Sequence, residues 1–168
     1  LLTFAKGVTS GTVPMGGVIV RQGIYDAFMT GPDHAIELFH GYTYSGHPIA
    51  AAAGVATMDL YRDEKLFENA RKLEGVWADA AMSLKGNPLI EDIRTLGLVA
   101  AFDLKPVETP PGLRAYKAME NAFHEFGFLL RISADTIALS PPLIITKNQV
   151  EEIFMDKMPK VLASVAGL

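Results

Sequence analysis

A lysine that directly follows a short apolar run is the first candidate for chemistry. Lys6 comes after residues 1–5 (LLTFA) and before Gly7, an order typical of a strand that ends at a break in the backbone. Burial at a strand end disfavours the charged ammonium form, and this favours the neutral nucleophile that a Schiff base requires. A strand-end lysine that simply reaches solvent has the same pattern, so both interpretations stay open.

A glycine-punctuated loop at residues 40–48 (HGYTYSGHP) is the second candidate. Its glycines allow a close backbone approach to an anion, and Thr43 and Ser45 add hydroxyl donors just before an expected helix N-terminus. The loop could therefore hold a phosphate, or it could be an ordered turn whose aromatic rings pack and whose hydroxyls cap. His40 and His47 lack a nearby third ligand at a recognisable metal spacing, so no metal site is predicted.

An arginine within an apolar segment is the third candidate. Arg131 follows residues 128–130 (FLL), which we expect to form a buried strand over residues 128–132. A guanidinium that projects from such a strand requires an anionic partner, and its planar fork suits a carboxylate. That partner could be Asp103 or Asp135 in a structural ion pair, or the carboxylate of a substrate.

Composition excludes several classes of function. The 168 residues contain no cysteine, which rules out disulfides and thiolate metal sites and is compatible with the cytoplasm. The net charge is -4 without a block of like charges, so nothing indicates binding to nucleic acid or to an anionic membrane. A mean hydropathy of +0.22 indicates a large interface or a core whose other half is missing. The sequence also starts without Met, as if inside a buried strand, and we expect a piece of a longer chain.

The elements that must position these residues divide near residues 61–65 into a glycine-rich first part and a regular second part. In the first part we expect strands at residues 1–5 and 18–20, a short helix at 23–29 and an Ala-rich helix at 49–61. In the second part we expect a helix at 63–84, a buried strand at 98–102, an exposed loop at 109–112, a helix at 113–126 and strands at 128–132 and 136–139.

Apolar spacing predicts which face of each helix in the second part is buried. For the helix at 63–84 the inward positions are Leu66, Phe67, Ala70, Leu73, Trp77, Ala81 and Leu84; for the helix at 113–126 they are Leu113, Tyr116, Met119, Ala122, Phe123 and Phe126. A capping box at Thr146 and Gln149 should open a last helix. Pro159 should kink that helix or disturb its final turns.

Two ordered segments together resemble the class III aminotransferases. Residues 4–16 (FAKGVTSGTVPMG) resemble the cofactor-lysine segment of that family, and residues 40–48 resemble its second signature. The segment from Arg131 to residues 141–143 (PPL) fits as well. The subgroup that the sequence is most similar to is the omega-amino acid:pyruvate, or beta-alanine:pyruvate, aminotransferases, and the resemblance extends over essentially the whole chain.

This resemblance implies an α/β fold of fold type I with pyridoxal 5'-phosphate as cofactor. Residues 1–62 would be the C-terminal end of the large cofactor-binding domain, and residues 63–168 the small α+β C-terminal domain. Lys6 would form the internal aldimine and move protons, and Tyr42 and Thr43 would bind the cofactor. Thr43 would reach the phosphate of the neighbouring subunit, which implies a homodimer with a shared active site. Arg131 would hold a substrate carboxylate in a ping-pong transfer from an omega-amino acid or amine to pyruvate.

The family's other cofactor contacts are expected to precede the lysine: a Gly/Ser phosphate-binding turn, a ring-stacking aromatic residue and an aspartate at the pyridine nitrogen. None is present in these 168 residues, which alone should not form a competent enzyme without the N-terminal part of the same protein. One alternative is a truncated, non-catalytic module that serves only dimerisation or interaction. Another is a lysine aldolase, which would not require the loop at residues 40–48.

Overall fold

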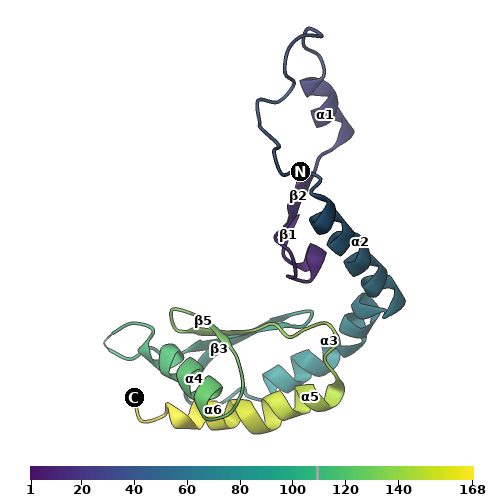
Figure 1. Cartoon of the computed structure of the whole chain (residues 1–168). Helices are drawn as coiled ribbons and strands as arrows, with labels where there is room; N and C mark the ends of the chain where they lie inside the picture. Colours follow the sequence, from purple (N-terminus) through teal and green to yellow (C-terminus); the bar gives the residue numbers. More distant parts are fainter. Residues whose placement is uncertain (109) are drawn as a thin grey trace. The chain divides into compact units, whose positions relative to one another are not determined.

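The computed structural model describes residues 1–108 and 110–168 and divides into two compact units, Leu1–Lys65 and Leu66–Leu168. Figure 1 shows the elements of both units along the chain. The loop expected at residues 109–112 begins at Thr109, which lies outside the described residues. Within the described ranges, no helix has the length and apolar character needed to cross a membrane.

The first unit consists of a strand pair and two helices. Its elements are β1 (Leu2–Ala5), a short 3-10 helix η1 (Gly7–Thr9), β2 (Gly16–Ile19), α1 (Gln22–Phe28) and α2 (Pro48–Asp63). The strands β1 and β2 pair antiparallel, with Phe4 opposite Gly17. A Cβ atom at Gly17 would overlap the ring of Phe4, so glycine leaves the space that this ring occupies. The strands and helices fall close to the positions that the sequence predicts.

The expectation that the first strand is buried is wrong for this structure. Leu2 is 58% exposed, and Phe4, whose ring lies over Gly17, is half-buried. The cause is the small size of the sheet, since a two-stranded ribbon buries side chains only where another layer packs on it. Among the described residues of this unit, the only buried hydrophobic residue is Ala50, on α2.

The second unit is an antiparallel sheet covered by helices. The sheet has four strands in the order β3-β4-β6-β5. These are β3 (Ile90–Leu96), β4 (Val99–Leu104), β5 (Arg131–Ser133) and β6 (Thr136–Leu139); the helices are α3 (Leu66–Met82), α4 (Leu113–His124), α5 (Lys147–Glu151), a π-helix η2 (Glu152–Lys157) and α6 (Met158–Ser164). Figure 1 shows α4, α5 and α6 on the same side of this sheet.

A continuous core fills the space between sheet and helices. Phe102 and Ile137 face each other across β4 and β6 and are fully buried. The Trp77 ring of α3 meets the Phe154 ring edge-on at 4.9 Å, and Phe154 lies 6.2 Å from Phe102. Such aromatic contacts contribute both buried area and a preferred geometry. The second unit therefore has a hydrophobic core of its own.

Three predicted inward positions are wrong. Phe67 is 60% exposed, and Tyr116 and Phe123 on α4 are 46% and 56% exposed. The helix α4 instead packs through small side chains, and its buried residues are Arg114, Ala115, Ala118 and Ala122. Alanines allow a helix to approach a sheet closely, whereas a pattern based on large apolar residues selects the neighbouring face.

The last helical segment begins as predicted but accommodates its proline differently. The Thr146 hydroxyl accepts a hydrogen bond from the Gln149 backbone N–H at 3.3 Å, and the Gln149 side chain accepts one from the Thr146 backbone at 2.9 Å, which confirms the capping box. Pro159 lies in the first turn of α6, and the disturbance precedes it as the π-helix η2. Proline's ring clashes with a carbonyl one turn earlier in a regular helix, and a wider turn makes room for that ring.

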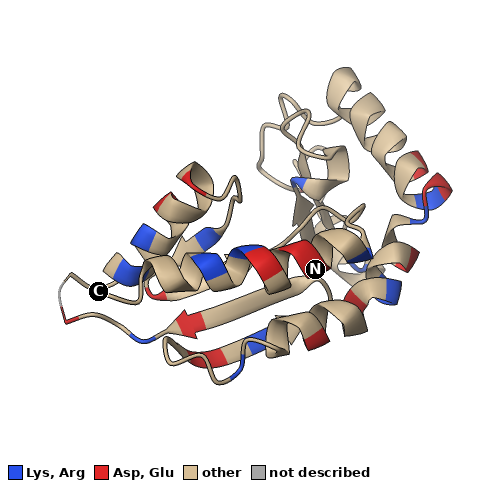
Figure 2. Ribbon diagram, turned by 90° about the horizontal axis from the view of Figure 1, so that it is seen from below, with Lys and Arg blue, Asp and Glu red and all other residues tan. Residues whose placement is uncertain are grey.

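Charged residues of both signs are interspersed on the helices of the second unit. Figure 2 shows acidic and basic positions interspersed on them. Several form i,i+3 or i,i+4 pairs, among them Lys117 with Glu120 at 2.7 Å and Lys147 with Glu151 at 3.6 Å. Exposed pairs of this kind contribute little to stability. They are typical of a solvated helix surface rather than of a site for a polyanion.

Candidate functional site

Lys6 occupies a strained position at the end of β1. It is the N-cap residue of η1 with φ 59° and ψ -80°, a combination that residues with a Cβ rarely adopt. Its carbonyl accepts hydrogen bonds from the backbone N–H groups of Thr9 at 3.2 Å and Gly11 at 3.1 Å. The side chain is exposed, so the described residues do not provide the desolvation expected of a buried strand-end lysine.

The turn after Lys6 is closed by hydroxyl groups. Thr9 is fully buried, and its hydroxyl donates to the Val13 carbonyl at 2.6 Å. The Thr12 hydroxyl in turn donates to the Thr9 carbonyl at 2.7 Å. From α2, the Tyr61 hydroxyl donates to the Gly7 carbonyl at 2.6 Å. The sequence interpretation missed these residues, although hydroxyl residues on both sides of Gly11 are a local signal for a side-chain-closed turn.

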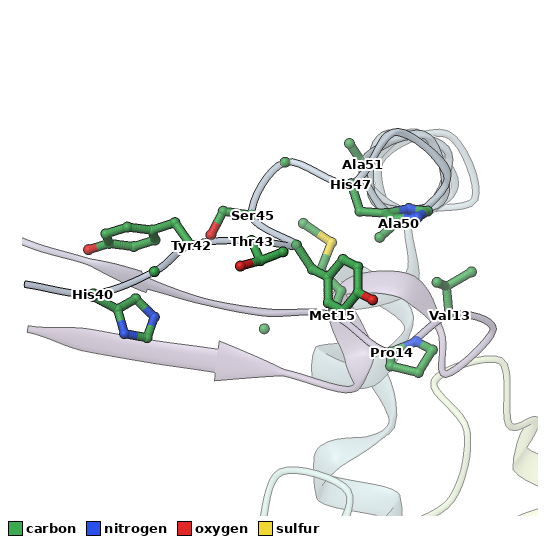
Figure 3. Close-up of a pocket in the computed structure, with 14 residues that line it drawn as sticks. Val13, Pro14, Met15, His40, Tyr42, Thr43, Ser45, His47, Ala50 and Ala51 are labelled. Carbon is green, nitrogen blue, oxygen red and sulfur yellow. The ribbon is translucent and has the colours of Figure 1, made fainter.

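The loop at residues 40–47 surrounds a cavity of about 1030 Å³. The cavity is completed by residues 13–16, which follow the Lys6 turn, and by Ala50 and Ala51 at the start of α2. Figure 3 shows the loop that carries Tyr42 and Thr43 running beside the segment that carries Pro14 and Met15. The structure therefore brings the predicted residues Tyr42 and Thr43 together in one cavity. Lys6 does not line it.

The geometry of this loop suits an anion. Tyr42 has φ 51° and Gly46 has φ 68°, and these two positions turn the backbone around the cavity. Gly41 lies close to the Thr43 hydroxyl, since a Cβ there would be 3.8 Å from its oxygen. The described lining contains hydroxyl, imidazole and backbone groups and no carboxylate. Such a donor set fits a phosphate group, because nothing in it repels negative charge.

Histidine rings pack against the tyrosines of this loop. The rings of His40 and Tyr42 meet edge-on at 4.5 Å, and those of Tyr44 and His47 at 6.5 Å. Packing of the aromatic residues was one of the two interpretations of the sequence, and it coexists here with an open cavity. Within the described residues, no group of three His, Cys, Asp or Glu side chains is arranged to hold a metal ion.

Arg131 begins an edge strand rather than projecting from a buried one. The strand β5 starts at Arg131, later than the expected residues 128–132, and Arg131 is exposed. Its expected structural partners bind elsewhere. Asp103 accepts hydrogen bonds from Arg94, and Asp135 accepts one from the Gly112 backbone at 3.2 Å. Within the described part of the chain Arg131 has no acidic partner, so the structural ion pair is wrong.

The ion pair on the same sheet shows how Asp103 is engaged. Arg94 forms a forked contact with both oxygens of Asp103 and also reaches Asp92 at 2.7 Å. Thr136 donates a hydrogen bond to Asp103 at 2.7 Å. The Arg94 guanidinium, and next the Thr136 hydroxyl, hold the pKa of Asp103 below its usual range because both stabilise the carboxylate. This network is structural, and it leaves Asp103 unavailable to Arg131.

Comparison with known proteins gives a consistent result. A family model described as "Aminotransferase class-III" matches residues 1–162. An omega-aminotransferase of Caulobacter vibrioides is 47% identical over 167 residues, 99% of this chain and 37% of that protein. A beta-alanine–pyruvate aminotransferase of Pseudomonas aeruginosa is 35% identical over 168 residues, 99% of this chain and 37% of that protein.

A solved structure supports the fold. The amine transaminase of an uncultivated Pseudomonas species, in a PLP-bound form, superimposes with a TM-score of 0.85 at 29% identity and covers 98% of this chain and 38% of that one. The present chain thus has part of the α/β transaminase fold and spans between a third and two fifths of the length of these relatives. Because the family model covers nearly all of its residues, the chain belongs to the class III aminotransferases.

Proposed function

We propose that this chain acts within a pyridoxal-phosphate-dependent aminotransferase that moves an amino group from an omega-amino acid or amine to a keto acid such as pyruvate. The observation that carries the proposal lies in the first unit. It combines an exposed lysine on a strained turn with an anion-fitting cavity, and residues 13–16 connect the two. Family membership and the names of the relatives support the reaction class.

The proposed roles of the two parts of the chain follow those of the family. Residues 1–62 would complete the large cofactor-binding domain, and residues 63–168 would form the small domain. Tyr42 and Thr43 would bind the cofactor, with Thr43 on the phosphate of a cofactor held by the neighbouring subunit of a homodimer. Two observations support the shared site: Lys6 does not line the cavity of Thr43, and the first unit exposes many large apolar side chains. We propose the cytoplasm as the location.

The chemistry assigns distinct tasks to this chain's residues. When bound, pyridoxal phosphate supplies an electron sink for the bond broken at the donor carbon. Lys6 would hold the cofactor through its amine and carry a proton at Nζ between donor carbon and cofactor. The donor gives up its amino group and becomes a carbonyl compound, with one water consumed. The keto acid takes up that amino group, and one water is released, so no external oxidant is required.

Arg131 would bind the carboxylate of the amino or keto acid. Its exposure and its lack of an acidic partner among the described residues support this role, because a guanidinium without an internal partner can donate hydrogen bonds to both oxygens of a carboxylate. A plain amine donor has no carboxylate, so Arg131 would serve the keto acid in that case. Turnover of a panel of amino donors, with pyruvate as acceptor, would identify the donor.

Replacement of Lys6 tests the proposal. In the whole protein, Lys6→Ala should abolish the visible absorbance of bound pyridoxal phosphate, because the amine that holds the cofactor is removed. The matched control is Lys85→Ala, which removes an exposed lysine of the second unit and should leave the spectrum unchanged. A Lys6→Ala protein with the wild-type spectrum would refute the assignment.

A non-catalytic interaction module is the second candidate. The complete core of the second unit favours it, because that unit has the packing of a stable small domain. The measurement that separates the two is amine transfer to pyruvate by the 168-residue chain with added pyridoxal phosphate. Robust turnover by this chain would contradict the hypothesis of a non-catalytic module. Absence of turnover by the whole protein would contradict the proposed aminotransferase activity.

A further inference from the structure

We infer that Tyr61 is a positioning residue that fixes the backbone of the Lys6 turn and thereby aims the lysine amine. This inference rests on the proposed role of Lys6. Tyr61 lies near the end of α2, and its hydroxyl donates to the Gly7 carbonyl at 2.6 Å across 54 residues of sequence. A Cβ at Gly7 would lie 3.4 Å from that hydroxyl oxygen, so the helix and the turn are in close contact.

The strain at Lys6 explains why such a contact is required. A residue with a Cβ at φ 59° and ψ -80° stays in that conformation only where its surroundings enforce it. The Lys6 carbonyl is held by Thr9 and Gly11 from within the turn. The Gly7 carbonyl, one residue on, accepts from the Ser10 N–H at 3.1 Å and from Tyr61. Tyr61 thus connects the turn to a regular helix, which the local hydrogen bonds cannot do.

The same helix connects the turn with the anion-fitting cavity. At its start, Ala50 and Ala51 line that cavity. In its middle, Gly54 lies against Val8 and Met15, and a Cβ there would be 3.7 Å from the Val8 carbonyl oxygen. Near its end, Tyr61 binds Gly7. The helix α2 therefore holds the lysine turn and the loop of Thr43 in one frame, and Tyr61 is the hydrogen-bonded end of that frame.

The test is Tyr61→Phe in the whole protein, with Tyr25→Phe as the matched control. Phenylalanine retains the ring and removes only the hydroxyl, so the fold should persist. Tyr25 is an exposed tyrosine of α1. In the cofactor-free protein, amide hydrogen exchange over residues 7–12 should accelerate roughly five-fold in Tyr61→Phe, the factor that one hydrogen bond contributes. Tyr25→Phe should exchange like the wild type there.

The loaded protein gives a second readout. Tyr61→Phe should lower kcat roughly five-fold, with the donor KM unchanged because Tyr61 is proposed to act through the backbone and not on substrate. The pH midpoint of the visible absorbance should also shift, since the amine of Lys6 would be aimed differently. A role in folding alone would lower thermal stability and leave that midpoint in place.

The outcomes separate the two proposals. Wild-type exchange over residues 7–12 and an unmoved midpoint in Tyr61→Phe would overturn the positioning role, as would acceleration spread equally over α1. If Lys6→Ala retains the visible absorbance, the proposed function fails, whereas the exchange of the cofactor-free turn still reports on Tyr61. Loss of the visible absorbance in Lys6→Ala, together with faster exchange confined to residues 7–12 in Tyr61→Phe, supports both the proposed function and the positioning role of Tyr61.

Discussion

Two arginines on one face of the sheet have opposite surroundings. The strand register places Arg131 opposite Ala138, Ala138 opposite Ala101 and Ala101 opposite Arg94, so the arginines occupy the two ends of one cross-strand row. Arg94 is engaged by acidic neighbours, and Arg131 has none among the described residues. Only small alanines separate them. An anion from elsewhere can therefore approach Arg131 without displacing an internal partner, which is what the proposed carboxylate contact requires.

The ion pair at the other end of this row should make stability depend on pH. The folded-state pKa of Asp103 is depressed, mainly by Arg94, so its contribution is fully present above the ordinary Asp value of about 3.9 and is lost as the pH falls through the depressed value. We expect Asp103→Asn to lower the free energy of unfolding by about 1 kcal/mol at pH 7. Urea unfolding of variant and wild type at neutral and acid pH measures this.

An exposed acid on a helix provides the control for that experiment. Glu120→Gln breaks the exposed pair with Lys117 on α4 and should change stability little. The difference between Asp103→Asn and wild type should shrink toward acid pH. A difference of the same size at pH 7 and well below pH 3.9 would mean that the charge of Asp103 is not its source.

At the scale of elements, α2 is an Ala-rich helix whose buried face is defined by close approach. Its buried residues are Ala50, Gly54 and Thr57, and Gly54 lies against Val8 in the turn that follows Lys6. Large apolar residues such as Val55 and Leu60 lie on exposed faces of the same helix. Small residues allow the helix axis to lie near the turn, and this proximity is what permits Tyr61 to reach the Gly7 carbonyl.

The size of the side chain at position 54 should therefore decide whether α2 keeps its contact with the turn that follows Lys6. Gly54→Ala should be tolerated or mildly stabilising, because its Cβ would make ordinary contact with Met15 at 3.4 Å and alanine favours a helix by about 1 kcal/mol. Gly54→Leu should destabilise the first unit by about 1–3 kcal/mol through overpacking. If α2 moves away from the turn, amide hydrogen exchange over residues 7–12 should become faster in Gly54→Leu than in Gly54→Ala. Equal exchange in the two variants would show that the contact at Gly54 is unimportant.

At the scale of the whole molecule, the two units differ in how much apolar surface they bury. The hydrophobic core lies entirely within the second unit, whereas the first exposes large apolar side chains on each of its elements except η1. Examples are Ile19 on β2, Phe28 on α1 and Val55 on α2. Surface of this kind is typical of a face that another layer or chain covers. It agrees with the chain's span of 37% of its relatives.

This difference in buried apolar surface predicts that, in the isolated 168-residue chain, the amides of the two units are unequally protected from hydrogen exchange. Amides of the second unit should exchange slowly through a cooperative opening, and those of the first unit should exchange quickly, because few buried contacts restrain them. Phe154→Ala should destabilise the second unit by about 3–5 kcal/mol, as expected for a fully buried aromatic residue. It should leave exchange in the first unit unchanged. Equal slow exchange in both units would contradict the prediction.

Local signals in the sequence predicted most elements and part of the candidate site. The capping box at Thr146 and the glycine-flanked hydroxyl of Thr43 were recognisable because both depend on neighbours within a few residues. The edge position of Arg131 and the hydrogen bond from Tyr61 to Gly7 were not, since they depend on strand order and on contacts across 54 residues. The outward-facing ring of Tyr116 was missed because the packing distance of α4 is set by alanines.

The Phe4 ring over Gly17 makes the side-chain sizes allowed at these two positions of the hairpin depend on each other. Because a Cβ at position 17 would overlap that ring, no side chain can be gained there while the ring keeps its place. A larger residue at position 17 therefore requires the Phe4 ring to move aside or a smaller side chain to replace it. Since position 4 lies two residues before Lys6, the side-chain size allowed at position 17 depends on the strand that leads into Lys6.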